Sequence, residues 1–295
     1  MSMVARSAPP VSSRGTICRV AAGPFVAPVL LWVMLWNGTC RRNRALLAAL
    51  GFCVCPHTTV AATEKTVEHN AAYEHCLAEV KRDAKGALTE AEEWAAAGGG
   101  AASLHCAALA LVQLKRYAEG AQSLENAARI TADTAPKANL LDQAGNAWLL
   151  TDDAAKAEAA LTAALALAPK DEDILADRAR ARGAAKNWSG AFEDLTAVLA
   201  LDPDRADIYV LRASALHAEG KKKEARADIA HALAIYPGYA EALVERGAMR
   251  MESGDISGAR DDWQQVAREV PDSGAGQTAR ARLQQLSAPA QRPKR

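Results

Sequence analysis

Two histidine–cysteine doublets, His75-Cys76 and His105-Cys106, carry the residues best suited to chemistry in this chain. Three roles fit them: a disulfide between the cysteines, a metal site that includes both histidines, or two buried free thiols. Adjacent residues on a helix point about 100° apart, so each doublet is poorly arranged to hold one metal ion. Tetrahedral zinc ligands are also usually spaced further along the chain. This geometry disfavours the metal site and leaves the disulfide and the free thiols.

The cysteine count favours the disulfide over two free thiols. Four of the six cysteines fall in an N-terminal leader, namely Cys18, Cys40, Cys53 and Cys55. The two that remain are an even number, and export to an oxidising compartment would promote their pairing.

No set of residues resembles a catalytic site. His69, His217 and His231 have no recognisable nucleophile or acid partner, and the chain has no P-loop, no HExxH motif and no Gly-rich strand-to-helix loop. We therefore expect neither an enzyme nor a cofactor. An active site within the irregular region 67–134 is the alternative.

Arginines and aspartates recur together along the second half of the chain. Each Asp follows its Arg by sixteen residues, in the pairs Arg178–Asp194, Arg212–Asp228 and Arg246–Asp262. In the preceding unit both partners are absent together, since Ala144 and Ala160 occupy their positions. Joint presence and joint absence predict an ion pair inside each unit. The alternative is a ladder of arginines that binds an anionic ligand.

These residues belong to a repeat of 34 residues, which four prolines mark: Pro169, Pro203, Pro237 and Pro271. Small residues recur in the same phase at Gly145, Ala179, Ala213 and Gly247, and alanines at Ala157, Ala191, Ala225 and Ala259. Large apolar residues follow four positions later, at Leu161, Leu195, Ile229 and Trp263. A unit of this length is one supersecondary element that buries its apolar face against its neighbours.

Each unit reads as two helices. In residues 172–205, one apolar-periodic segment runs from Ile174 to about Ala185 and a second from Ala191 to Leu201, where Asp202-Pro203 ends it. With its small residue, its alanine, its large apolar residue and its closing proline, the unit resembles the tetratricopeptide repeat (TPR) family, of an exported bacterial type. The resemblance implies an all-α fold: a right-handed α-solenoid of stacked antiparallel helix pairs with a C-terminal capping helix.

The repeat predicts the organisation of the chain. We expect divergent helix pairs over 67–134, four units over 138–171, 172–205, 206–239 and 240–273, a capping helix over 274–286 and a disordered tail over 287–295. Cys76 and Cys106 would then lie on the first helices of neighbouring pairs, which pack side by side.

The resemblance also implies a binding surface, because the first helices of such arrays line a concave face where a partner peptide commonly lies. By register the groove would present Asp142, Asn146, Asp177, Arg180, Val210, Ser214, His217, Val244, Glu245, Ala248 and Met251. This set is chemically mixed. It lacks the aligned lysine, arginine and asparagine with which some TPR domains hold a chaperone's terminal carboxylate, which disfavours that class of partner.

The leader, residues 1–62, reads as an export signal over 41–62. Arg41-Arg42-Asn43-Arg44 precedes a short apolar run, and Val60 and Ala62 lie where a signal peptidase reads small residues. We hypothesise that translation starts at Met34 and that the mature protein is exported, to the periplasm. A membrane anchor made of residues 25–55 is the alternative, and an uncleaved leader would be the route to a membrane.

Charge excludes one class of partner. Residues 1–62 hold six arginines, no lysine and no acid, so the rest of the chain carries 29 basic against 35 acidic residues. Phosphate binding needs a basic face, and nucleic acid is therefore excluded as a partner. The sequence favours an exported, non-catalytic module that binds a protein or an extended peptide. An assembly or regulatory subunit of a cell-envelope complex is the second interpretation.

Overall fold

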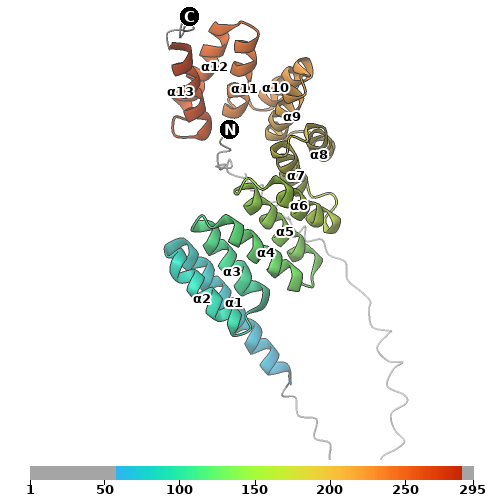
Figure 1. Ribbon diagram of the computed structural model, residues 1–295, viewed down its shortest axis with the longest axis vertical. Helices are drawn as coiled ribbons and strands as arrows, with labels where there is room; N and C mark the ends of the chain where they lie inside the picture. Colours follow the sequence, from blue (N-terminus) through green and yellow to red (C-terminus); the bar gives the residue numbers. More distant parts are fainter. Residues whose placement is uncertain (1–57, 288–295) are drawn as a thin grey trace, which may run out of the picture. The chain divides into compact units, whose positions relative to one another are not determined.

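The computed structural model describes residues 58–287, and this part of the chain is entirely helical (Figure 1). Its thirteen helices are α1 (Thr58–Arg82), α2 (Ala84–Ala96), α3 (Gly100–Gln113), α4 (Tyr117–Ile130), α5 (Thr134–Leu149), α6 (Ala154–Leu167), α7 (Glu172–Ala184), α8 (Trp188–Leu201), α9 (Ala206–Ala218), α10 (Lys222–Ile235), α11 (Ala240–Glu252), α12 (Ile256–Glu269) and α13 (Gly274–Ser287). Apart from the first turns of α1, they lie in one compact unit that begins at Lys65.

Consecutive helices fold back on one another as antiparallel pairs. In the pair α7–α8, residues later in α7 contact residues earlier in α8, as antiparallel helices do. Arg178 contacts Asp194, and Arg182 donates to the carbonyl of Gly190. From α2 onward each helix packs against the next along the chain, and from α5 onward the first helices of neighbouring pairs also touch. The predicted fold class, an all-α solenoid of stacked helix pairs, is confirmed.

The turns inside the pairs repeat the same local chemistry. Asp153, Asn187 and Asp255 cap the second helices, because their side chains accept hydrogen bonds from backbone N–H groups of the first turn. The residue before the N-cap position of α4, α6, α8, α10 and α12 has a positive φ, between 60° and 88°, at Lys115, Asp152, Lys186, Gly220 and Gly254. Three of these five are not glycine, so the place in the helix pair determines this turn more than the residue type does.

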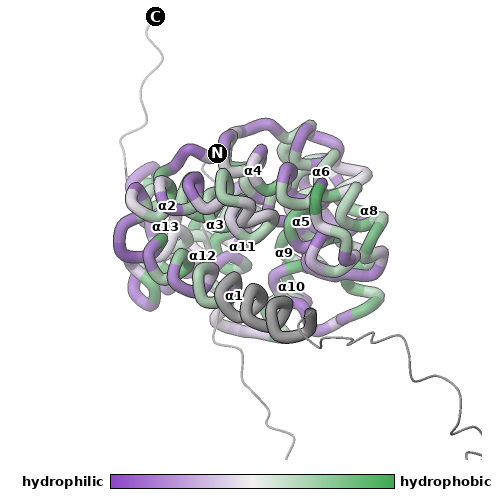
Figure 2. The backbone as a smooth tube through the Cα atoms, turned by 90° about the horizontal axis from the view of Figure 1, so that it is seen from below, coloured by the Kyte–Doolittle hydropathy of each residue, from purple (hydrophilic) through white to green (hydrophobic). Residues whose placement is uncertain are grey.

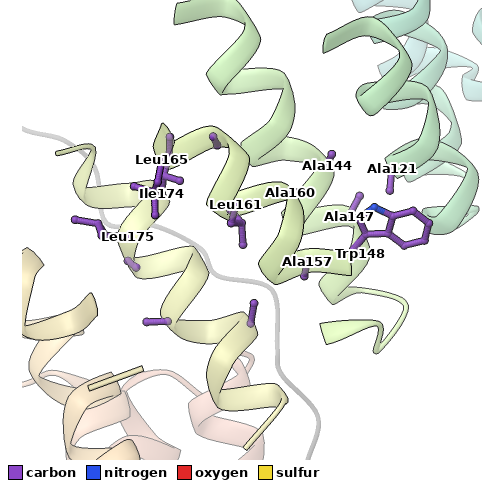
Figure 3. Packing of buried hydrophobic residues seen from close by; sticks show 14 of the residues in the cluster. Ala121, Ala144, Ala147, Trp148, Ala157, Ala160, Leu161, Leu165, Ile174 and Leu175 are labelled. Atoms are coloured by element: carbon purple, nitrogen blue, oxygen red, sulfur yellow. The ribbon is translucent and has the colours of Figure 1, made fainter. Parts of the chain in front are cut away.

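The core consists of many alanines around a smaller number of large apolar residues. Leu161 is fully buried in the same cluster as Ala144, Ala157 and Ala160, and Trp148 packs beside Ala121 and Ala147 (Figure 3). Apolar and polar residues alternate along the helices (Figure 2), so most helices bury one face. Between residues 58 and 287, no helix has a stretch long and apolar enough to cross a bilayer.

The small residues of the repeat let the paired helices approach closely, as the sequence predicts. A Cβ atom at Gly145 would overlap the side chain of Leu161, and one at Gly247 would overlap the indole of Trp263. That indole is buried, and its Nε1 donates a hydrogen bond to the carbonyl of Val244 at 3.1 Å. Each small residue therefore makes room for the large residue of its own pair.

The predicted ion pairs are also confirmed. Arg178 donates two hydrogen bonds to the carboxylate of Asp194, at 2.9 and 2.7 Å, and the other two pairs have the same bidentate geometry. The three aspartates are buried. A buried carboxylate needs such partners because its desolvation is costly. These contacts lie inside each helix pair, so the guanidinium groups do not form a ladder along the array.

Two helices begin earlier than the repeat phase suggests. α5 begins at Thr134, upstream of the expected start at 138, since Pro136 lies in the first turn, where a missing N–H costs no hydrogen bond. α1 begins at Thr58 and so overlaps the last residues of the predicted leader. The rest of that leader and the tail beyond Ser287 lie outside the described residues.

Candidate functional site

The candidate binding surface lies on the first helices of the C-terminal pairs. Along the chain, α5 contacts α7, α7 contacts α9, α9 contacts α11, and α11 contacts α13. All the residues predicted to line the groove lie on α5, α7, α9 or α11. Asp142, Asn146, Asp177 and Arg180 form one polar cluster, and His217 and Glu245 belong to a second.

The first cluster joins α5 to α7. Asn146 donates a hydrogen bond from Nδ2 to one carboxylate oxygen of Asp177 at 2.5 Å, and Arg180 donates to the other oxygen. Asp177 is buried, while Asn146 and Arg180 are half-buried. Both oxygens of Asp177 are therefore used inside the cluster, which fixes the positions of Asn146 and Arg180 on this face.

Asp142, one turn before Asn146, is the least satisfied group of this cluster. Its Oδ1 is buried without a hydrogen-bond partner in the part of the chain that the structure describes. Burial, followed by the nearby carboxylates of Asp177, Asp171 and Asp173, raises the pKa of Asp142 from 3.8 to about 7, and Arg180 opposes the shift. This side chain can accept a hydrogen bond from a ligand and can change charge near neutral pH.

The raised pKa makes stability depend on pH. The unfolded chain ionises this carboxyl near pH 4, whereas the folded chain holds its proton up to about pH 7. The folded state thus binds the proton more tightly, and the stability that this group contributes is present below about pH 4 and is lost as pH rises through about 7. We expect the urea midpoint of the wild type to fall between pH 5 and 8 more steeply than that of Asp142→Asn.

The matched control is Asp204→Asn, which makes the same chemical change at an exposed site. Its urea midpoint should follow the pH dependence of the wild type. Identical slopes for the wild type and Asp142→Asn would contradict the assignment of the raised pKa to Asp142.

The second cluster joins α9, α10 and α11. His217 Nε2 lies 3.1 Å from Oε1 of Glu252, and Lys222 donates to the other oxygen of Glu252 at 2.9 Å. His217 Nδ1 is buried without a partner among residues 58–287. Burial raises the pKa of Glu245, and the positive charges of His217 and Arg282 oppose that shift.

The structure corrects part of the predicted groove. Val210 and Val244 are buried in the apolar core, so their side chains offer little surface to a partner. Ser214 is exposed, and its hydroxyl donates to the carbonyl of Val210 in its own helix. Met251 is exposed, while the adjacent Glu252 is the residue that contacts His217. Glu252 was missed because the repeat gives no signal at that position.

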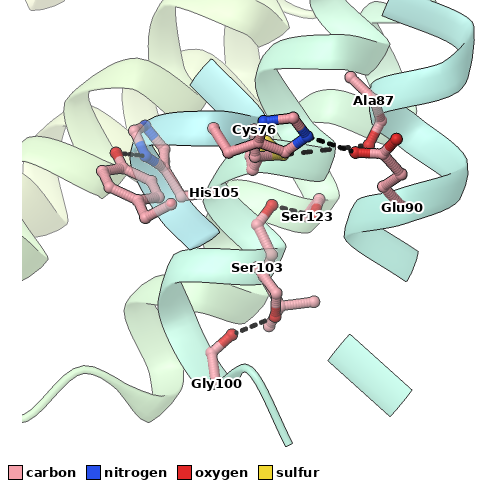
Figure 4. Close-up of a disulfide and its surroundings, with 11 residues drawn as sticks. Cys76, Ala87, Glu90, Gly100, Ser103, His105 and Ser123 are labelled. Atoms are coloured by element: carbon pink, nitrogen blue, oxygen red, sulfur yellow. Dashed lines mark hydrogen bonds and ion pairs between the residues drawn. A yellow bond between two sulfur atoms is a disulfide. The ribbon is translucent and has the colours of Figure 1, made fainter. Parts of the chain in front are cut away.

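The N-terminal pairs hold the disulfide (Figure 4). Cys76 on α1 and Cys106 on α3 are bonded, with their Cα atoms 6.2 Å apart. His75 contacts Glu90 on α2 at 3.4 Å, whereas His105 hydrogen-bonds Tyr73 at 2.6 Å and Gln143 at 2.9 Å. The histidines therefore face different partners, and neither sulfur is a thiolate that could ligate a metal.

The fold has well-matched counterparts among solved structures, although no protein-family model and no curated protein matches the chain. A structure of PilF from Pseudomonas aeruginosa aligns with a TM-score of 0.54 at 16% identity, over 72% of this chain and 97% of that one. YrrB, described as a TPR protein with an unusual peptide-binding site, aligns with a TM-score of 0.52 at 18% identity, over 63% and 97%.

A third counterpart is MamA from Desulfovibrio magneticus RS-1, with a TM-score of 0.50 at 20% identity over 59% of this chain and 97% of that one. At these identities the likeness concerns the fold. Together with the helix-pair geometry, it shows that the chain has the fold of TPR proteins.

Proposed function

We propose that this chain, which has the tetratricopeptide fold, is a non-catalytic scaffold that binds a protein or an extended peptide along α5, α7, α9 and α11. One observation carries the proposal: this face holds polar groups that residues 58–287 do not satisfy. Asp142 Oδ1 and His217 Nδ1 are buried without partners in the described residues. Leaving such groups unpaired is costly, and a bound peptide would supply the missing hydrogen bonds.

The charges on this face suggest the chemistry of the partner. Asp142, Asp177 and Glu245 outnumber Arg180, and Asp177 is already paired with Arg180. The remaining carboxyl groups accept hydrogen bonds, and Asp142 loses its own donor as it ionises above about pH 7. A segment rich in donors, such as exposed backbone N–H groups with lysine or arginine side chains, therefore suits this face better than an acidic segment.

Two features support an exported location within this proposal. Residues 41–62 have the basic, apolar and small-residue order of a secretory signal. The disulfide between Cys76 and Cys106 suits an oxidising compartment such as the periplasm. Both features are equally compatible with a subunit of a cell-envelope complex, which would use the same surface.

The test blocks the surface without disturbing the core. Ser214 is exposed in the middle of the face, so Ser214→Trp obstructs it at no cost in packing, and Lys223→Trp adds the same side chain on an exposed position of α10. Wild type, Ser214→Trp and Lys223→Trp are each used to purify partners from the exported fraction. We expect a partner that the wild type and Lys223→Trp retain and Ser214→Trp loses. Equal retention by all three proteins would reject the proposed surface.

A further inference from the structure

A pocket of about 460 Å³ lies between α10 and α11, on residues that the proposed binding face does not use. Its lining combines three arginines with apolar side chains: Arg226, Ile229, Ala230, Leu233, Ala234, Arg246, Met249, Arg250 and Ser253. The corresponding junctions α6–α7 and α8–α9 carry different residues at the equivalent positions, and comparing the three junctions shows what is unusual here.

At the α6–α7 junction the arginines are satisfied from the preceding helix. Arg182 Nε donates to Glu158 at 2.8 Å, and Arg178 Nη1 reaches the hydroxyl of Thr162 at 3.5 Å. At the α8–α9 junction Arg212 Nη1 reaches Thr196 at 3.4 Å and lies over the ring of Phe192. In each case the second helix of one pair supplies a partner for the arginine of the next.

At the α10–α11 junction those partners are replaced. The position of Glu158 and Phe192 is occupied by Arg226, and the position of Thr162 and Thr196 by Ala230. Arg226 is exposed and has no ion pair or hydrogen bond within residues 58–287. The acidic partner has thus become a third positive charge, and the hydroxyl has been lost.

The two arginines on α11 are consequently open to solvent. Their side chains are 36% exposed for Arg246 and 35% for Arg250, against 17% for Arg178 and 19% for Arg212. Both arginines donate hydrogen bonds to the carboxylate of Asp262. Arg246 donates from Nε and Nη2, and Arg250 donates from Nη1. Nη1 of Arg246, the atom that meets a threonine at the other junctions, has no such hydroxyl because Ala230 lacks one.

We propose that this pocket binds a carboxylate joined to an aliphatic body. The pocket lining holds three positive charges, and Asp262 and the more distant Asp255 offset two of them through Arg246 and Arg250, which leaves about one net positive charge for a monoanion. Guanidinium groups bind the two oxygens of a carboxylate with matching planar geometry. Ile229, Leu233 and Met249 line the same pocket and suit an alkyl chain rather than a hydrated ion such as phosphate.

Calorimetric titration of the full chain at low ionic strength tests the ligand class, with octanoate as the probe. Octanoate should bind at least about tenfold more tightly than octanol, which lacks the charge, or acetate, which lacks the alkyl chain. Added salt should weaken octanoate binding. Equal affinity for octanoate and octanol, or no measurable octanoate binding, would overturn the proposal.

Two variants tie binding to the pocket. Arg226→Glu restores an acid where the α6–α7 junction has Glu158, so Arg250 gains an internal partner and octanoate affinity should fall at least about tenfold. Arg260→Glu makes the same charge change on an exposed position of α12 and should leave affinity unchanged. Unchanged octanoate affinity in Arg226→Glu, in a protein with wild-type circular dichroism, would reject the pocket as the site.

A last pair of ligands separates two sources of the same chemistry. A short acetylated peptide that ends in leucine carries a carboxylate next to an aliphatic side chain at its C-terminus. The same peptide with an amidated C-terminus lacks that charge. Binding of the free acid but not of the amide would assign the pocket to a chain terminus. Binding of octanoate alone would assign it to a small aliphatic acid.

Discussion

Replacing Leu195 with alanine is expected to lower the free energy of unfolding by about 2–5 kcal/mol. Leu195 is 2% exposed and belongs to the core cluster that continues from α3 to α9. It fills the space that the small side chain of Ala179 leaves between α7 and α8. Replacing Leu195 by alanine would therefore leave a cavity, because contacts with α6 and α9 hold these two helices in place. Close-packed interiors relax little around such a loss.

Leu201→Ala provides the matched control for this measurement. Leu201 lies at the end of the same helix and is 44% exposed, so the same substitution should change stability by less than about 0.5 kcal/mol. Urea titration followed by circular dichroism compares the two variants with the wild type. A Leu195→Ala protein that unfolds like the parent would show that Leu195 is not in the core.

Breaking the Cys76–Cys106 disulfide is the second change with a large expected effect. The bond joins residues separated by 30 positions, and closing a loop of that length stabilises a fold by about 3–4 kcal/mol in the chain-entropy model. Because each helix pair contacts its neighbours alone, the loss should fall on α1–α4 and spare the distant pairs. Hydrogen exchange of backbone amides before and after reduction measures both regions in one sample.

Amides of α9–α12 serve as the internal control for the reductant. They should keep their protection while amides of α1–α4 exchange faster. A Cys76→Ala/Cys106→Ala protein should show the same regional pattern without any reductant. Uniform acceleration over all helices, or none in α1–α4, would contradict a local role for the bond.

The sequence was sufficient for those features that the repeat itself encodes. Spacing alone located the small residue at Gly247 and the large one at Trp263, because their sizes must complement each other wherever two helices touch. The pairing of Arg212 with Asp228 followed from their joint recurrence, because a buried carboxylate is tolerated where a cation accompanies it. These are interactions within one unit, which sequence periodicity records directly.

Features that depend on contacts between units were predicted less well. The register placed Val210 and Val244 in the groove, yet both side chains are buried in the apolar core. Asp194 also accepts a hydrogen bond from a second arginine, Arg182, which was not predicted from the sequence. The next unit has Leu216 at the equivalent position, so this arginine does not recur in every unit. Likewise, Ala230 replaces the threonine that contacts the arginine of the next helix at the other junctions, and this loss is evident only from the packing of α10 against α11.

Covalent reinforcement at one end has a consequence for how the array comes apart. Terminal elements of a linear stack have a neighbour on one side, so they fray before the interior does. The crosslink between α1 and α3 protects the N-terminal end from this process, while α13 is held without a disulfide, through its contacts with α11 and α12. Proteolytic nicking and partial melting should therefore start at the C-terminal end and advance toward the stapled one.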